Sequence, residues 1–366
     1  MFGIRWGLVL LIAIVACFGI AMLYSAADGN MQPWATKQTM RFAIALIPML
    51  GAALLGIRNW FRLAYWTYLI TLLLVVGVDL RGFVGMGAQR WIDLGVIQLQ
   101  PSELMTVALL LALARYFHQL GNEEDLKVRA LVLPSIMIAL PVMLVLRQPD
   151  LGTAVVLLMC GGVMFFLAGV RLCFFLLIGG AAGAAIPIVW RFLRDYQKSR
   201  IYTFLYPDND PLGAGYHILQ SKIALGSGGL FGKGFLSGTQ SHLNFLPEKQ
   251  TDFIFTTLAE EVGLIGAMTL LAVYCAIIAY GFASALRCRN RFSRYLGIGI
   301  ITNFFLYVFI NIAMVTGLIP VVGVPLPLIS YGGTAMLTVM FGFGLLLSVR
   351  VDRDVRLNPA GEVHPG

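Results

Sequence analysis

The acidic residues are the side chains most suited to chemistry, because 59% of this 366-residue chain is hydrophobic and a carboxylate near hydrocarbon is costly. Paired carboxylates can serve as acid and base in glycosyl chemistry. Spacing along the chain does not measure how far apart they lie in space. We expect the following acids to face one side of a membrane: Asp93, Glu103, Asp150, Glu248, Asp252, Glu260 and Glu261.

Each of the main acidic candidates also has an ordinary structural explanation. Asp252 follows Thr251, so Thr251 could cap a helix whose dipole the carboxylate complements. Glu103 follows Pro101, and proline with a first-turn acid is typical of a helix start. Glu260 comes eight residues after Asp252, which on one helix is the same face about 12 Å further along. The alternative for Glu260 is a buried pair with an arginine or a Ser/Thr cluster.

Two other features have both a chemical and a structural interpretation. Trp91, next to Arg90, could stack on a sugar ring, but an anchor at the membrane interface is the simpler interpretation. The glycine-rich run at 226–234 lacks the GxxxxGK[ST] pattern of a nucleotide-binding loop. Its glycines would still allow the backbone to approach a phosphate closely.

The composition indicates which elements must position these residues. Only 12% of residues are charged, about half the share in an average soluble domain, which excludes an ordinary cytosolic enzyme and a secreted disulfide scaffold. The sequence predicts an all-α integral membrane protein, one bundle over residues 1–366. Ten transmembrane helices are expected at about 7–25, 41–57, 63–79, 101–117, 131–146, 151–168, 172–190, 253–285, 295–319 and 333–350.

The distribution of basic residues predicts the orientation. Arg and Lys concentrate in the segments that lie inside if both termini are cytoplasmic. The one large loop, about 191–252, is then extracytoplasmic, opens with a helix on the membrane surface, and folds over a cavity between the spans. The net charge of +8 is explained by anchoring to anionic lipid headgroups and does not call for nucleic acid. The five cysteines show no CxxC spacing, so neither zinc nor a disulfide is indicated.

Several motifs, in order along nearly the whole chain, resemble the SEDS family of peptidoglycan glycosyltransferases, and within it the RodA branch that acts in cell elongation and rod shape. The segment 314–325 favours that branch over the FtsW branch of cell division. One position departs from the family pattern, because a lysine usually follows the glutamate of the QPSE motif by three residues and here Thr106 stands there. The motifs are 100–104, 147–153, 213–234, 243–255 with Glu260 and Glu261, and 325–334.

The resemblance implies a polymerase of lipid II in the bacterial inner membrane, working at the outer face with inversion of the anomeric carbon. It assigns Asp252 as the base for the acceptor 4-hydroxyl. A Mg²⁺ or Mn²⁺ ion, held by Glu103 and Asp252, is expected to bind the diphosphate of the undecaprenyl-linked donor, and no organic cofactor is expected. The implied partners are a class B penicillin-binding protein and the elongation machinery. Further substrate-binding candidates are Trp91, Arg41, Asp150, Lys222, Lys233, Lys249 and Glu260.

Two rival functions stay open at this point. A transporter that flips lipid II across the membrane would also have many spans and intramembrane acids. A scaffold without activity could recruit the crosslinking partner. The gathering of acids toward one face, and the absence of a recognisable inverted repeat, favour the enzyme.

Overall fold

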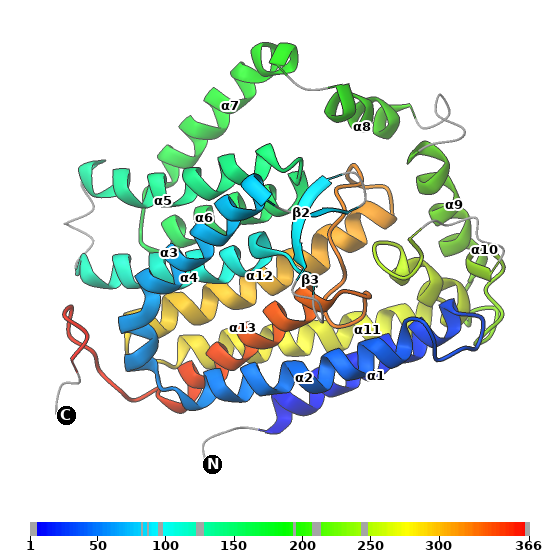
Figure 1. Cartoon of the computed structure of the whole chain (residues 1–366), viewed down its shortest axis with the longest axis horizontal. Helices are drawn as coiled ribbons and strands as arrows, with labels where there is room; N and C mark the ends of the chain where they lie inside the picture. The colour runs from blue at the N-terminus through cyan, green and yellow to red at the C-terminus, as the bar shows by residue number, and fades with distance from the viewer. Residues whose placement is uncertain are drawn as a thin grey trace.

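A computed structural model of the chain describes residues 6–81, 83–85, 88–93, 98–121, 128–192, 195–206, 214–242 and 248–362. Long helices cover all ten ranges predicted as spans (Figure 1). They are α1 (Trp6–Ala26), α2 (Ala35–Leu54), α3 (Ile57–Arg81), α4 (Pro101–Gln119), α5 (Val128–Arg147), α6 (Leu151–Leu167), α7 (Leu172–Phe192), α11 (Ile254–Leu286), α12 (Arg291–Val315) and α13 (Gly333–Val351).

Six helices among the described residues are long and apolar enough to cross a membrane: α1, α3, α5, α11, α12 and α13. Helices α6 and α7 are also apolar, but their apolar stretches, Leu151–Leu167 and Leu172–Pro187, are shorter than those of the six. Large apolar side chains such as Leu73, Leu140 and Leu177 point outward and are more than 40% exposed. A surface of this kind is stable against lipid and not against water, so the chain is a multi-pass membrane protein.

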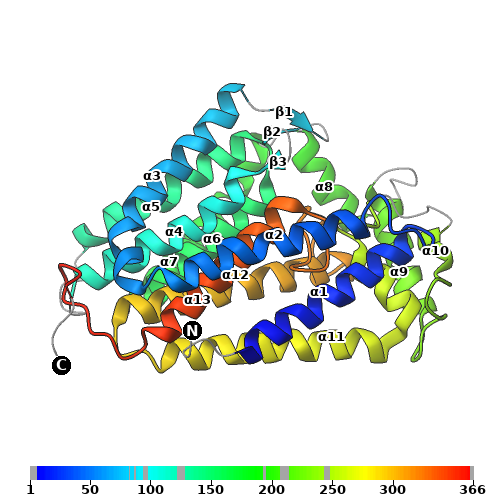
Figure 2. The ribbon, with the colours of Figure 1, turned by 60° about the horizontal axis from the view of Figure 1, so that its bottom comes forward.

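The core lies where α4 and α12 run through the middle of the bundle (Figure 2). Most of α12 is buried, and every residue of α4 from Met105 to Ala114 is buried. Helices α2 and α13 lie side by side. Gly344 permits that approach, because a Cβ at this position would overlap the backbone of Met49. A small residue at a helix crossing is the usual means of close packing in a membrane.

The all-α prediction is wrong between α3 and α4. A small antiparallel sheet forms there, in the order β1 (Phe83–Gly85), β2 (Ala88–Asp93), β3 (Gln98–Leu99). The segment is too short and too rich in glycine for a periodic pattern to show, and pairing between strands satisfies its backbone groups instead. Strand β3 leads directly into Pro101, which begins α4.

The described residues of the segment expected at 191–252 form three short helices, α8 (Asp195–Leu205), α9 (Ala214–Ser227) and α10 (Thr239–His242). The surface helix predicted from residue 191 instead starts at Asp195, because α7 continues to Phe192. Trp190 of α7 and Tyr202 of α8 meet edge to face, with ring centroids 5.4 Å apart. In Figure 1, α7 diverges from the rest of the bundle toward α8.

Helix α11 is broken at Gly263, whose backbone angles are φ 72° and ψ −170°. Past the break, the Leu264 amide donates to the carbonyl of Gly229 at 2.9 Å, and the Ile265 amide donates to that of Leu230 at 3.1 Å. The glycine-rich run therefore accepts the hydrogen bonds that the interrupted helix leaves unmade.

The same run also donates to the first part of α11. The amides of Lys233 and Gly234 reach the carbonyls of Glu260 and Glu261, each at 3.0 Å. Gly232 directly precedes these two residues at φ 79°, and a Cβ there would overlap the Glu261 carbonyl. Gly228 and Gly232 thus allow close approach of the run to the backbone of α11.

Candidate functional site

A cavity of about 260 Å³ brings together residues from β2, α4, α6, the segment before α11 and the loop before α13. Four carboxylates line it, from Glu103, Asp150, Glu248 and Asp252, together with the indole of Trp91. The sequence predicted Glu103, Asp150, Asp252 and Trp91 as site residues, and the fold brings these four into one cavity although they are far apart in the chain.

Asp252 is held in the cavity by its backbone. The side-chain amide of Asn311 donates to the Asp252 carbonyl at 3.0 Å and to the Val324 carbonyl at 2.8 Å. The Asp252 carboxylate lies against Gly323, where an added Cβ would be 3.4 Å from Oδ2. Asn311 comes from α12, so the buried core of the bundle fixes where Asp252 stands.

The prediction of Thr251 as a possible helix cap is wrong. The residue that caps α11 is Phe253, and it makes no side-chain capping hydrogen bond. The Thr251 hydroxyl instead donates to the carbonyl of Glu248 at 3.2 Å. Glu248 has φ 55°, an uncommon conformation for this residue type. Thr251 therefore does not cap α11, and Asp252 lies two residues before the first residue of the helix.

The loop before α13 holds the same segment from the other side. The Ser330 hydroxyl donates to the Thr251 carbonyl at 2.6 Å, and the Tyr331 amide donates to that of Gln250 at 2.8 Å. Ser330 Oγ also accepts from the amide of Leu326 at 2.7 Å. The motif 325–334 is thus a scaffold that positions the segment containing Asp252.

Glu103 and Asp150 stand at the starts of two neighbouring helices. Glu103 is 5% exposed, and its Oε2 is buried with no hydrogen-bond partner among the described residues. Asp150 caps α6 through the Thr153 amide at 3.2 Å and hydroxyl at 2.8 Å. The Gln100 side chain donates to Asp150 at 3.0 Å. Asp150 is therefore satisfied by protein groups, whereas Glu103 retains an oxygen for a ligand.

Arg90 supplies the positive charge of the cavity, a role that the sequence did not predict. It is the only Lys, Arg or His among the described residues that line it. Its guanidinium donates to the carbonyls of Gln148, at 3.0 Å, and Pro149, so the side chain is held in place. At the position where the family usually has lysine, Thr106 is buried and its hydroxyl donates to the Ser102 carbonyl at 3.3 Å.

Comparison with known proteins places this geometry in a family. The family model described as cell cycle protein, of the FtsW, RodA and SpoVE type, matches residues 1–355. The chain belongs to this family.

Relatives of this family cover most of the chain. The peptidoglycan glycosyltransferase MrdB of Escherichia coli K12 is 44% identical over 94% of this chain and 93% of its own length. MrdB of Helicobacter pylori is 39% identical over 85% of the chain and 81% of its own length. The SEDS family predicted from the sequence motifs is thus confirmed.

Two solved structures share the fold. One chain of a peptidoglycan synthase complex that coordinates polymerization and crosslinking superposes with a TM-score of 0.84, at 32% identity, covering 96% of this chain and 99% of that one. The rod shape determining protein RodA of Thermus thermophilus has a TM-score of 0.73 at 31% identity, covering 96% of this chain and 97% of its own.

Arg41 is not among the described residues that line the cavity, but it contacts one of them. Its guanidinium carbon is 4.3 Å from the ring centroid of Tyr331, and Tyr331 lines the cavity. One guanidinium nitrogen of Arg41 is buried without a hydrogen-bond partner. This cation–π contact orients the Tyr331 ring.

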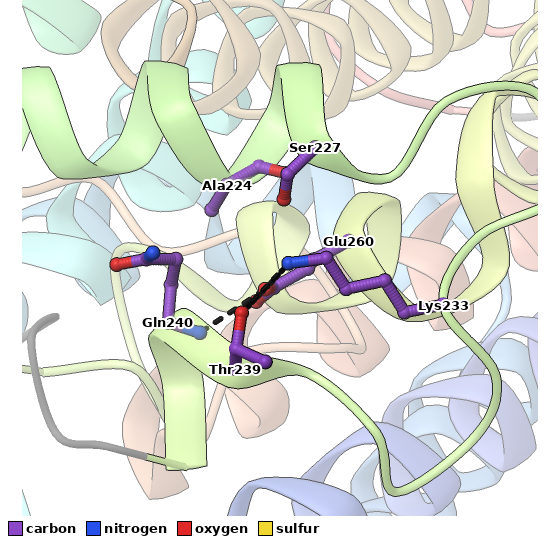
Figure 3. Close-up of polar contacts among 6 residues, drawn as sticks. All are labelled: Ala224, Ser227, Lys233, Thr239, Gln240 and Glu260. Carbon is purple, nitrogen blue, oxygen red and sulfur yellow. Dashed lines mark hydrogen bonds and ion pairs between the residues drawn. The ribbon is translucent and has the colours of Figure 1, made fainter.

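Lys233 and Glu260 lie apart from the cavity and bind each other. Their charged atoms are 2.7 Å apart, and Glu260 also accepts from the Thr239 hydroxyl and the Gln240 amide, each at 3.0 Å (Figure 3). The Glu260 side chain is fully buried. The expected common face with Asp252 does not arise, because α11 begins only at Ile254. The buried pair predicted as the alternative does form, with a lysine and Thr239 as partners.

The other two lysines predicted as substrate-binding residues, Lys222 and Lys249, are also absent from the described residues that line the cavity. Lys222 is exposed on α9, with its side chain against Gly317. Lys249 is buried, and this burial lowers the pKa of its ammonium, while the charge of Asp28 acts to raise it.

The carboxylates suit a divalent cation that is shared with a substrate. Among the described residues, no group of three or more His, Cys, Asp or Glu side chains is arranged to hold a metal by itself. Mg²⁺ commonly takes one or two carboxylates and completes its coordination with water and substrate phosphates. The open oxygen of Glu103 and the Asp252 carboxylate fit that mode.

Proposed function

We propose that this chain is a peptidoglycan glycosyltransferase that polymerises lipid II, with Asp252 as the general base. The observation that supports this proposal is the placement of the Asp252 carboxylate in a cavity with Trp91, Arg90 and three other acids. Relatives at 44% and 39% identity carry the name of this activity.

The proposed reaction is a single displacement. The donor glycan is α-linked to an undecaprenyl diphosphate and the product is β-1,4-linked, so the acceptor 4-hydroxyl of lipid II attacks from the face opposite the diphosphate. Asp252 accepts the proton of this hydroxyl as the new C–O bond forms. The anomeric C–O bond breaks, and its electron pair leaves on the diphosphate.

The residues around Asp252 have supporting roles in this proposal. Arg90 stabilises the charge that develops on the departing diphosphate. Glu103 and Asp252 would hold a Mg²⁺ or Mn²⁺ ion, which would neutralise the diphosphate when bound. The flat, partly exposed indole of Trp91 packs against a sugar ring.

The proposed topology has ten spans, both termini in the cytoplasm and the cavity at the extracytoplasmic face of the inner membrane. It rests on the basic residues. Arg287 and Arg289 follow the end of α11, and Arg291 and Arg294 lie in the first turn of α12, at the end of the bundle away from Asp252. The proposed partner is a class B penicillin-binding protein, since the related synthase complex couples polymerization to crosslinking.

The test compares Asp252→Asn with the unchanged protein, using labelled lipid II and the purified chain in detergent. The asparagine keeps the shape but does not accept a proton, so polymerisation should fall about 10²–10⁴-fold. Asp354→Asn, an exposed acid at the far end, is the matched control and should retain activity.

Near-normal polymerisation by a well-folded Asp252→Asn protein would remove Asp252 as the base. Failure of the unchanged protein to polymerise, with flipping of lipid II in sealed vesicles, would favour the transporter. Partner binding without either activity would favour the scaffold.

A further inference from the structure

A second cavity, of about 340 Å³, lies at the opposite end of the bundle from Asp252. It opens between the ends of α4, α6 and α11 and the start of α12. Glu103 near the start of α4 lines the first cavity, whereas Phe117 near its end lines the second. The intervening turns of α4 separate the two cavities by about 20 Å.

This second cavity is positively charged. Arg291 and Arg294 line it together with Tyr295, and no acidic side chain is among its described lining residues. Arg291 donates to the carbonyl of Gly121. The Arg294 guanidinium has no hydrogen bond or ion pair with any described residue. A cavity whose described lining residues include two guanidinium groups and no carboxylate is suited to an anion, which guanidinium binds with paired donors.

An apolar groove of about 440 Å³ lies next to this cavity, between α5 and α7. Its lining is hydrophobic except for Ser135, and it includes Ile136, Ala139, Phe165 and Phe174. Leu167 and Ala168 at the end of α6 line the charged cavity, while Phe165 and Val170, two to three residues away, line the groove. About one turn of chain therefore separates the lining of the charged cavity from the lining of the groove.

Packed aromatic rings lie between the charged cavity and the apolar groove. The ring of Phe117 in the charged cavity is 5.7 Å from that of Phe165 in the groove, edge to face, and 6.5 Å from that of Tyr295. A ligand that fills both spaces would thus pass from guanidinium groups over an aromatic wall into a hydrocarbon-lined groove. It must carry an anionic head and a long apolar tail.

We propose that these two spaces form one binding site for an anionic glycerophospholipid. Arg291 and Arg294 bind the phosphate, and an acyl chain occupies the groove between α5 and α7. In the topology proposed above, the site faces the cytoplasmic leaflet, where basic pockets between transmembrane helices bind anionic headgroups. It is separate from the Asp252 cavity and does not depend on the activity proposed there.

The test is a titration of the purified full-length chain, in neutral detergent, with dioleoyl phosphatidylglycerol and with dioleoyl phosphatidylcholine. Binding is followed by native mass spectrometry and by the rise in melting temperature. Phosphatidylglycerol should bind more tightly than phosphatidylcholine. The double variant Arg291→Gln/Arg294→Gln should weaken it on the order of 25-fold, since each basic residue near anionic lipid contributes about fivefold. Arg58→Gln, an exposed arginine on α3, is the matched control and should bind normally.

Two further measurements distinguish binding of the anionic headgroup from binding of the acyl chain. Ala139→Phe fills the groove without changing charge, and should weaken dioleoyl phosphatidylglycerol more than its dihexanoyl analogue. Inorganic phosphate at the same concentration should not raise the melting temperature. Should the double variant fail to fold, Arg294→Gln alone, which loses no internal hydrogen bond, replaces it.

The proposal is overturned if phosphatidylglycerol and phosphatidylcholine bind equally, or if the arginine variants bind as the unchanged protein does. It is also overturned if inorganic phosphate alone reproduces the stabilisation, which would indicate a site for a free anion. Equal weakening of long and short chains by Ala139→Phe would remove the groove from the site.

Discussion

The pair of Lys233 and Glu260 should stabilise the docking of the glycine-rich run on α11, and a double-mutant cycle tests this. Glu260 is fully buried and Lys233 is 27% exposed. Removing one partner of a buried pair costs about 3–5 kcal/mol. Glu260 keeps hydrogen bonds from Thr239 and Gln240, and water reaches Lys233, so we expect about 2–3 kcal/mol for Lys233→Met.

The measurement is the melting temperature in detergent at one fixed scan rate, because membrane proteins often unfold irreversibly. About 2 °C per kcal/mol is a reasonable conversion for a long chain, so Lys233→Met should melt about 4–6 °C lower. Glu260→Gln should also destabilise. The double variant Lys233→Met/Glu260→Gln should lose less than the two single losses combined, because it leaves no unpaired buried charge. Additive losses, or an unchanged melting temperature for Lys233→Met, would refute this account of the pair.

Three further outcomes are expected. Glu103→Gln should reduce polymerisation and raise the Mg²⁺ or Mn²⁺ concentration needed for half-maximal activity; an unchanged metal dependence would leave Glu103 a helix-start residue only. Gly232→Ala should lower the melting temperature, because the new Cβ would overlap the Glu261 carbonyl. Gly226→Ala should be neutral or stabilising, because Gly226 has open space around it. Equal effects of the two variants would contradict the close approach of Gly232 to the backbone of α11. In spheroplasts, a membrane-impermeant thiol reagent should label Ser237→Cys and not Arg289→Cys, and the reverse pattern would invert the proposed topology.

The sequence was informative where apolar periodicity extends over whole helices. Each of the ten predicted ranges is covered by a helix, with ends displaced by a few residues, because twenty or so apolar residues have few alternatives to a helix in lipid. The motifs were equally informative about the family. The sheet of 83–99 was missed, since its strands are too short to show alternation.

The site was predicted only in part, because its assembly depends on contacts between distant segments. Trp91, Glu103, Asp150 and Asp252 were named from their residue types and motifs, and they do meet. Arg90 was named only as a neighbour of Trp91 and not as the cation of the cavity, since only the fold shows that it lines the cavity. Placing Glu260 with Asp252 assumed a continuous helix, an assumption that fails because α11 starts after Asp252.

The break in α11 also has a consequence for where the hydrocarbon begins. The helix has 33 residues, about 50 Å at 1.5 Å per residue, which exceeds a hydrocarbon core of about 30 Å. The part from Leu264 to Leu286 spans about 34 Å and matches that thickness. The preceding turns, with Glu260, Glu261 and the docked glycine run, then stand in the headgroup layer. Asp252 comes just before the same turns of α11, so under the proposed function a substrate would keep its polyprenyl tail in lipid while its sugars react at the water boundary.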